Sequence, residues 1–181
     1  VLEILPDGFG FLRSPDTSVF EGLRNLGQLP EEVRSFLTSP DLLLIMKANR
    51  KARVHRPVHM DTIIVKKIDK TGTVTGEHRF IGLFTSVAYN QSPGEIPMLR
   101  QKVQRIVSLG GFAPESHDGK ALLNILETYP RDELFQASED DLLATSIGIL
   151  HLQERQKIAL FMRPDPFERF VSVMLFVPRD H

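Results

Sequence analysis

A cluster of ionisable residues at His117, Asp118 and Lys120 is the first candidate for chemistry in this sequence. A histidine and a carboxylate can serve acid–base catalysis when both side chains are oriented toward a substrate. Adjacent sequence positions leave that orientation unspecified, and no nucleophile is evident nearby. The stretch also fits a helix start, where Asp118, or alternatively Ser116, accepts hydrogen bonds from free backbone N–H groups. We therefore interpret it as a capped helix, at whose start Lys120 could meet an anion.

A second candidate is the pair His55 and His59, which has the His-x3-His spacing of some metal sites. On a helix the two rings would share a face, but Pro57 and the β-rich surroundings indicate extended chain. Extended residues four positions apart lie roughly 13 Å from each other, which is too far for two ligands of one zinc ion. His78 would have to supply a third ligand. We interpret these histidines as surface or packing residues and predict no metal site.

A third candidate is the Gly-Phe-Gly-Phe core of residues 7–12. It resembles the RNA-stacking strand of cold-shock-type domains, including the one in transcription terminator Rho, and the likeness is best over residues 1–15. The resemblance implies single-stranded RNA binding by Phe9 and Phe11, which we keep as the alternative function. Tryptophan is absent, and the net charge of -1 provides no basic groove for a phosphate backbone. Our preferred interpretation therefore has no nucleic-acid partner.

Motifs for cofactor binding and catalysis are missing. Gly8-x-Gly10 does not extend to a dinucleotide fingerprint, because Arg13 stands where the third glycine should be and no βαβ unit surrounds it. The sequence also lacks GxxxxGK[ST], HExxH and GxSxG motifs. It contains no cysteine, which excludes disulfides and cysteine–zinc sites. We predict no catalytic, cofactor-binding or metal-binding residue in this chain.

The composition is that of an ordinary globular protein. Hydrophobic residues make up 41% of the 181 residues and charged residues 25%. No apolar run approaches the ~18 residues that indicate a membrane span, and nothing has the pattern of a signal peptide. We expect a cytoplasmic protein without a membrane partner. The start at Val1 and the strand-like sequence near the end suggest a piece of a larger protein.

Hydrophobic periodicity predicts strands over residues 41–86, helices over 94–156 and a hairpin over 157–178. Short links make each strand pair antiparallel. The expected fold class is α+β over residues 41–181, with an antiparallel sheet built from two hairpins that flank a helical block. This element order matches PAS-like domains, and the βαββαβ order of ACT-like domains fits less well. Residues 1–40 form an N-terminal segment, interpreted as the end of a preceding module.

Local signals set the predicted boundaries. Pro30 opens a short helix, and Gly72 turns the first hairpin. Gly110-Gly111 ends one helix and Ser138 caps another, while residues 163–166 connect the last hairpin. The helix before Gly110 is expected to bury an apolar face and to place its basic residues mostly elsewhere; the apolar residues are Ile96, Leu99, Val103, Ile106 and Val107, and the basic ones are Arg100, Lys102 and Arg105.

Four long ordered runs resemble the large bacterial NAD-specific glutamate dehydrogenases. They are KANRKARVHRPVHMDTIIVKKIDKTGTVTGEHRFIGLFTSVAY (47–89), IPMLRQKV (96–103), SHDGKALLNILETYPRDELFQ (116–136) and DPFERFVSVMLFVPRD (165–180). The resemblance extends over most of the chain and weakens before about Leu29. The polypeptides of this family are several times longer, with ACT-like and PAS-like modules ahead of a catalytic domain. This chain is similar to a slice of that N-terminal, non-catalytic region.

The resemblance implies that the parent enzyme oxidises L-glutamate to 2-oxoglutarate and ammonium and passes hydride to NAD. The family's catalytic and NAD-binding residues belong to the later domain and match no position here. The chain is therefore expected to be a regulatory or assembly module that is inactive as an isolated fragment. Its expected partners are other modules and subunits of a homo-oligomeric enzyme, and its expected ligand is an amino-acid effector.

Overall fold

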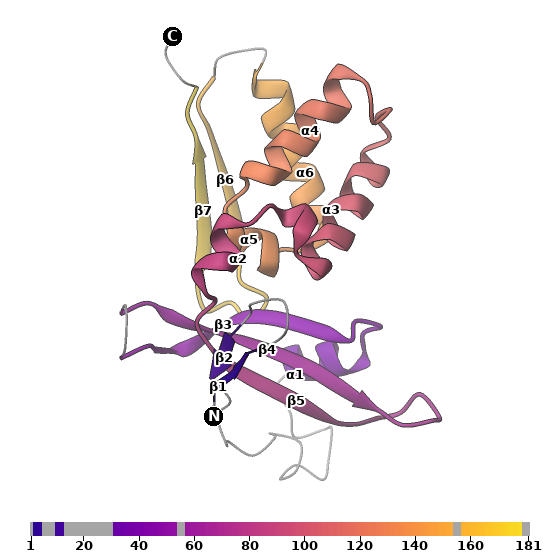
Figure 1. The fold of residues 1–181 in the computed structure, drawn as a ribbon, viewed down its shortest axis with the longest axis vertical. Coiled ribbons are helices and arrows are strands. Elements are labelled where there is room, and N and C mark those ends of the chain that lie inside the picture. The colour runs from indigo at the N-terminus through magenta and orange to yellow at the C-terminus, as the bar shows by residue number, and fades with distance from the viewer. Residues whose placement is uncertain (1, 5–9, 13–30, 54–56, 154–156, 179–181) are drawn as a thin grey trace. The chain divides into compact units, whose positions relative to one another are not determined.

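The computed structural model describes residues 2–4, 10–12, 31–53, 57–153 and 157–178 (Figure 1). The chain divides into two compact units, Val1–Asn90 and Gln91–His181. Each unit has its own antiparallel strands, and the second unit also contains a block of helices. The boundary predicted after residue 40 stays a prediction.

The first unit is built on a three-stranded antiparallel sheet in the order β3 (Leu43–Lys51), β4 (His59–Ile68) and β5 (Val74–Gly82). Gly72 turns the β4–β5 hairpin with a φ of 87°, a left-handed value that favours glycine. The Asp69 carboxylate accepts hydrogen bonds from the backbone N–H groups of Thr71 (2.8 Å) and Thr73 (3.0 Å) in the same turn. The turn that the sequence predicts is therefore confirmed.

The other elements of the first unit are short. Helix α1 (Glu31–Thr38) contributes the buried Leu37, and the Lys66 ammonium of β4 donates to the Ser39 carbonyl (2.7 Å) just past its end. The same ammonium lies 4.5 Å from the centre of the Phe36 ring. Strands β1 (Leu2–Ile4) and β2 (Gly10–Leu12) form an antiparallel pair, and α2 (Ser86–Asn90) follows β5.

The second unit begins with its helices: η2 (Pro93–Glu95), α3 (Pro97–Gly110), α4 (His117–Thr128), α5 (Arg131–Gln136) and α6 (Glu139–Gln153). Helix α3 ends as predicted, because Gly111 adopts a φ of 71° at its C-cap. Helices α3, α4 and α6 contact one another through apolar side chains at helical spacing. The fully or almost fully buried residues of this core include Leu99, Ile106, Leu122, Leu126, Leu134 and Leu142.

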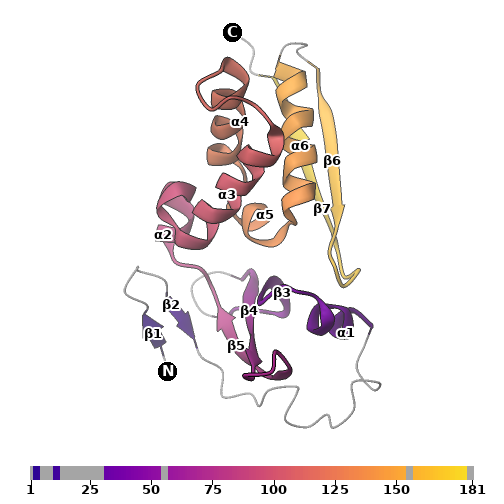
Figure 2. The same cartoon turned by 90° about the vertical axis from the view of Figure 1, so that its right-hand side faces the viewer.

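The last element is the hairpin of β6 (Ala159–Pro164) and β7 (Val171–Phe176), in which Leu160 pairs with Leu175 and Met162 with Val173. The helices of this unit lie on one side of the hairpin (Figure 2). Alternating side chains point toward these helices, and the Phe161 ring lies so close to Gly148 of α6 that an added Cβ would contact it at 3.0 Å.

The α+β class with antiparallel strands and a helical block is confirmed. One detail differs, because the strands form separate sheets and do not join the two hairpins into one. The last connection also begins later than predicted: β6 continues through Pro164, which leaves Arg163 inside the strand. The turn starts at Asp165, whose carboxylate accepts two hydrogen bonds from Arg169.

Candidate functional site

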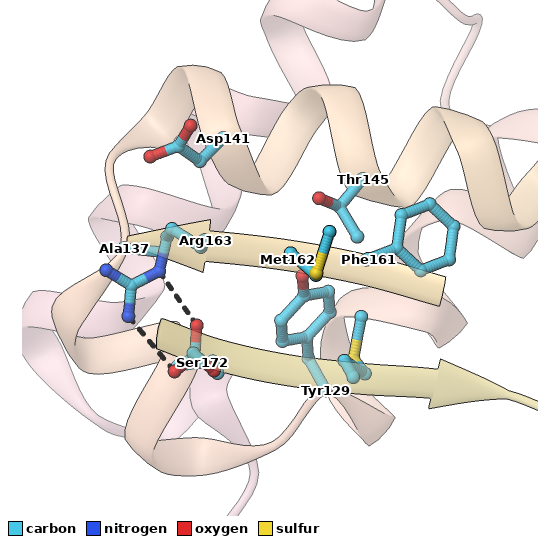
Figure 3. Close-up of a pocket in the computed structure, with 10 residues that line it drawn as sticks. Tyr129, Ala137, Asp141, Thr145, Phe161, Met162, Arg163 and Ser172 are labelled. Carbon is cyan, nitrogen blue, oxygen red and sulfur yellow. Dashed lines mark hydrogen bonds and ion pairs between the residues drawn. The ribbon is translucent and has the colours of Figure 1, made fainter. Parts of the chain in front are cut away.

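The polar side chains of the second unit gather where α5 ends, against α6 and the inner face of the β6–β7 hairpin (Figure 3). They surround a shallow pocket of about 50 Å³, which is room for a few water molecules. Its lining residues come from α4 through β7 and are Tyr129, Glu133, Ala137, Asp141, Thr145, Phe161, Met162, Arg163, Ser172 and Met174.

Lys102 of α3 bonds to the C-terminal end of α5. Its ammonium donates hydrogen bonds to the carbonyls of Leu134 (3.0 Å), Phe135 (3.4 Å) and Ala137. The last carbonyls of a helix have no partner within the helix and carry a partial negative charge, so a lysine suits this place. Burial lowers the pKa of Lys102 to about 8, although the negative charge of Glu139 opposes that shift.

An ion pair joins α5 to the hairpin. The Arg163 guanidinium donates through Nε to Glu133 Oε2 (2.8 Å) and through a terminal nitrogen to Oε1 (3.0 Å), a bidentate arrangement that Figure 3 marks with dashed lines. Both side chains are mostly buried, with exposures of 12% for Arg163 and 18% for Glu133. The pair therefore fixes the hairpin against the first turn of α5.

Two further polar groups beside the pocket interact with their neighbours in the unit. Burial raises the pKa of the Tyr129 hydroxyl, and its interaction with Thr145 of α6 opposes that shift. Ser138 accepts a hydrogen bond from the backbone N–H of Asp141 (3.1 Å) and donates to its carboxylate (2.8 Å). Ser138 thus caps the start of α6 as the sequence predicts, through the backbone N–H three residues further on.

These contacts support a structural interpretation of the site. Lys102, Arg163 and Tyr129 each interact with a group on another element of the same unit. These contacts hold the elements in their relative positions. In the part of the chain that the structure describes, no three histidine, aspartate or glutamate side chains are grouped to hold a metal ion.

The His117–Asp118 cluster is an exposed helix start. His117 Nδ1 lies 3.5 Å from an Asp118 carboxylate oxygen, and the His117 side chain is 96% exposed. The N-cap is Ser116, whose hydroxyl accepts from the backbone N–H of Gly119 (3.1 Å), so the alternative cap is the one that forms. The Lys120 ammonium nitrogen lies 3.1 Å from Oε2 of the exposed Glu115.

The two histidine candidates that the structure describes, His59 and His78, lie apart. His59 pairs with Lys51 and His78 pairs with Val65, which places the two histidines roughly six residues, about 20 Å, apart along β4. The His59 ring bonds to the backbone carbonyl of Ala48 (3.0 Å). His55 and Phe9 lie outside the described residues, and Phe11 belongs to β2.

Sequence reasoning missed the cluster around Lys102. The apolar face of α3 is confirmed, but Lys102 is turned toward the end of α5, although the sequence places it mostly away from that face. Its partners, like those of Arg163, lie some thirty residues away in the sequence. The one available signal was the lack of any basic residue in the last turn of α5, where the helix end needs a donor from elsewhere.

Two family models match the second unit. The one described as glutamate dehydrogenase, helical motif 1 covers residues 96–155, and the one described as glutamate dehydrogenase, ACT2 domain covers residues 159–181. The first corresponds to helices α3 to α6 and the second to the β6–β7 hairpin. The fold and these matches define a helical motif followed by ACT-like strands, and they favour the ACT-like over the PAS-like alternative for the hairpin.

Individual relatives identify the family. The chain is 46% identical over 145 residues to the NAD-specific glutamate dehydrogenase of Halomonas elongata, covering 80% of this chain and 9% of that protein. It is 33% identical over 176 residues to the Mycobacterium tuberculosis enzyme of the same name, covering 96% of this chain and 11% of that protein. The chain belongs to the family of large NAD-specific glutamate dehydrogenases and spans about a tenth of the length of these relatives.

A shorter match involves another protein. Over 35 residues, 19% of this chain, the sequence is 57% identical to transcription termination factor Rho of Chromobacterium violaceum, of which this covers 8%. The Rho-like character of residues 1–15 that the sequence indicates is consistent with such a match. Among the described residues, no helix is both long and apolar enough to cross a membrane.

Proposed function

We propose that this chain is a non-catalytic regulatory and assembly module of a large NAD-dependent glutamate dehydrogenase. The parent enzyme would convert L-glutamate and NAD to 2-oxoglutarate and ammonium in the cytoplasm, as a homo-oligomer. Two observations together support the proposal. The chain matches glutamate dehydrogenases along most of its length, and the polar side chains of Lys102 and Arg163 form their hydrogen bonds within their own unit. The partners would be other modules and subunits of the same enzyme.

The NAD site would belong to another part of the parent polypeptide. Dinucleotide-binding folds place the pyrophosphate at the start of a helix that connects two parallel strands. Every strand pair in the described residues is antiparallel, and Gly10 lies in the short β2 strand paired with β1. The residues that the structure describes therefore do not fit NAD, and we assign them no step of hydride transfer.

An amino-acid effector is the ligand to test first for the regulatory role. Isothermal titration calorimetry of the chain with L-glutamate and a set of other amino acids should give a saturable heat for at least one of them. The Arg163→Met variant serves as a probe of the pocket, because it removes the ion pair that organises the pocket wall. A heat that persists unchanged in this variant would locate the effector elsewhere in the chain, and silence across the whole set would leave an assembly role alone.

The assembly role has a separate readout. Sedimentation velocity of the full-length parent enzyme should show its oligomer weakened when Arg163 is replaced, because the hairpin loses its attachment to α5. An unchanged oligomer with a folded Arg163 variant would count against the module as an assembly element.

The second candidate function is single-stranded RNA binding, which the match to Rho favours. It would use Phe9 and Phe11, of which Phe11 belongs to β2. Fluorescence anisotropy of labelled RNA at low salt, with Phe11→Ala as the comparison, decides it. Loss of binding in the variant would support this function, and no binding by the unaltered chain would end it.

A further inference from the structure

The outer face of the β6–β7 hairpin is an apolar surface that no described part of the second unit covers. Five strand residues point away from the helices and are between 55 and 67% exposed. Ile158 and Val177 extend the surface on either side of the strands and are exposed as well. No outward-facing residue of the two strands is charged; the five large apolar residues are Leu160, Met162, Val171, Val173 and Leu175, and Pro164 is the sixth exposed strand residue.

The sequence of these strands predicts that both faces of the hairpin pack against other apolar groups. Residues 173–177 read VMLFV, an unbroken apolar run, whereas a strand with one wet face usually alternates polar and apolar residues. The inner set, which includes Phe161 and Met174, already packs toward the helices. A sheet of two strands also leaves two open edges. The exposed face therefore needs a covering layer.

The size of the face argues against a second copy of the chain as that layer. The face consists of eight exposed residues, the six outward-facing strand residues together with Ile158 and Val177. Each partner of a stable protein complex usually contributes about 20–30 residues. A segment of the same polypeptide needs far less area, because its effective concentration is high. About nine tenths of the relatives' length lies outside the matched region, so such a segment is available.

We infer that a further apolar layer of the parent polypeptide, supplied by the rest of the ACT2 domain, packs in cis on this outer face. The inference rests on the proposed function, because it takes the chain as part of a longer glutamate dehydrogenase. The layer presents aliphatic or aromatic side chains and no charge to Val173 and its neighbours, since a charge there would be buried without a partner. The hairpin thus connects the helical motif to the rest of the ACT2 domain.

Thiol labelling tests the inference directly, because the 181-residue chain contains no cysteine. Val173→Cys and Leu160→Cys place single thiols on the outer face, and Leu109→Cys on α3, at 58% exposure, is the exposed reference. In the isolated chain all three variants should react with a maleimide at similar rates. In the full-length parent, followed by mass spectrometry of the labelled peptides, the two outer-face thiols should react at least about tenfold more slowly than the reference and recover in denaturant.

Each other outcome overturns the inference. Equal reactivity of the outer-face thiols in the isolated chain and in the parent would mean that nothing covers the face. Protection in the isolated chain that grows with protein concentration would identify a second copy as the covering layer. Failure of the proposed function is separate: it would appear as no effector heat and an unchanged oligomer, whatever the labelling rates.

Discussion

Replacement of Lys102 by methionine tests the buried cluster most sharply. Methionine keeps an unbranched apolar stem but removes the ammonium from the carbonyls of Leu134, Phe135 and Ala137. Hydrogen bonds to a charged group contribute about 1.5–3 kcal/mol each, and burial of the charge offsets about 3 kcal/mol of that sum, as the pKa near 8 indicates. We expect the Lys102→Met variant to be less stable than the unaltered chain by about 1.5–6 kcal/mol at pH 7.

The same replacement predicts a pH dependence with a definite sign. The pKa of Lys102 is lowered from 10.5 to about 8 in the folded chain, so the burial cost is fully present below pH 8. Between pH 8 and 10.5 the unfolded chain holds a proton that the folded chain has lost, and stability therefore rises with pH. The variant lacks this contribution, so its deficit should widen by about 2–3 kcal/mol between pH 7 and pH 10.

Urea denaturation followed by circular dichroism at 222 nm measures both quantities, because most described helices belong to the second unit. When the variant and the unaltered chain are compared at each pH, the effect of other titrating groups on stability cancels, because both proteins contain them. Lys120→Met is the matched control, since Lys120 pairs only with the exposed Glu115 and should behave like the unaltered chain. A Lys102→Met variant of unaltered stability, or a deficit that shrinks as pH rises, would refute the reasoning.

Three further predictions concern the second unit, and urea denaturation checks each. Gly119→Ala should lose more than about 1 kcal/mol, because the new Cβ would overlap the Ala113 carbonyl; a neutral effect would show that this turn yields easily. Arg163→Met should lower the free energy of unfolding by about 3 kcal/mol, because it leaves Glu133 mostly buried and unpaired. Adding Glu133→Gln to this variant should restore part of the lost stability, whereas additive losses from the two replacements would contradict coupling between the two side chains. Ser116→Ala should cost about 1 kcal/mol and Ser116→Asp much less, whereas equal losses would count against the cap.

The helix ends and hairpin turns could be predicted from the sequence because their causes are local. Gly72 and Gly111 adopt the positive φ values that their positions require, and Ser138 caps α6 through a residue three positions away. At the start of α4 the sequence allowed either Ser116 or Asp118, and only backbone geometry selects the serine. Local signals therefore define the elements, and sometimes leave a choice of side chain.

The polar cluster could not be predicted because its partners are distant in the sequence. Lys102 has the spacing of a solvent-facing helix residue, and nothing local shows that the end of α5 will lie beside it. Arg163 sits next to Pro164 in a stretch that reads as a turn, yet the strand continues and directs the guanidinium to Glu133. The separation of the strands into different sheets likewise depends on pairing that periodicity does not encode.

The central claim is that this segment of a glutamate dehydrogenase carries no reaction centre of its own. The most direct measurement is the formation of NADH, followed at 340 nm, by the purified 181-residue chain with L-glutamate and NAD, beside the full-length parent enzyme. We predict no rate above that of the heat-unfolded chain, and steady NADH formation by the parent. Glutamate-dependent NADH formation by the isolated chain, abolished when it is unfolded, would contradict the account.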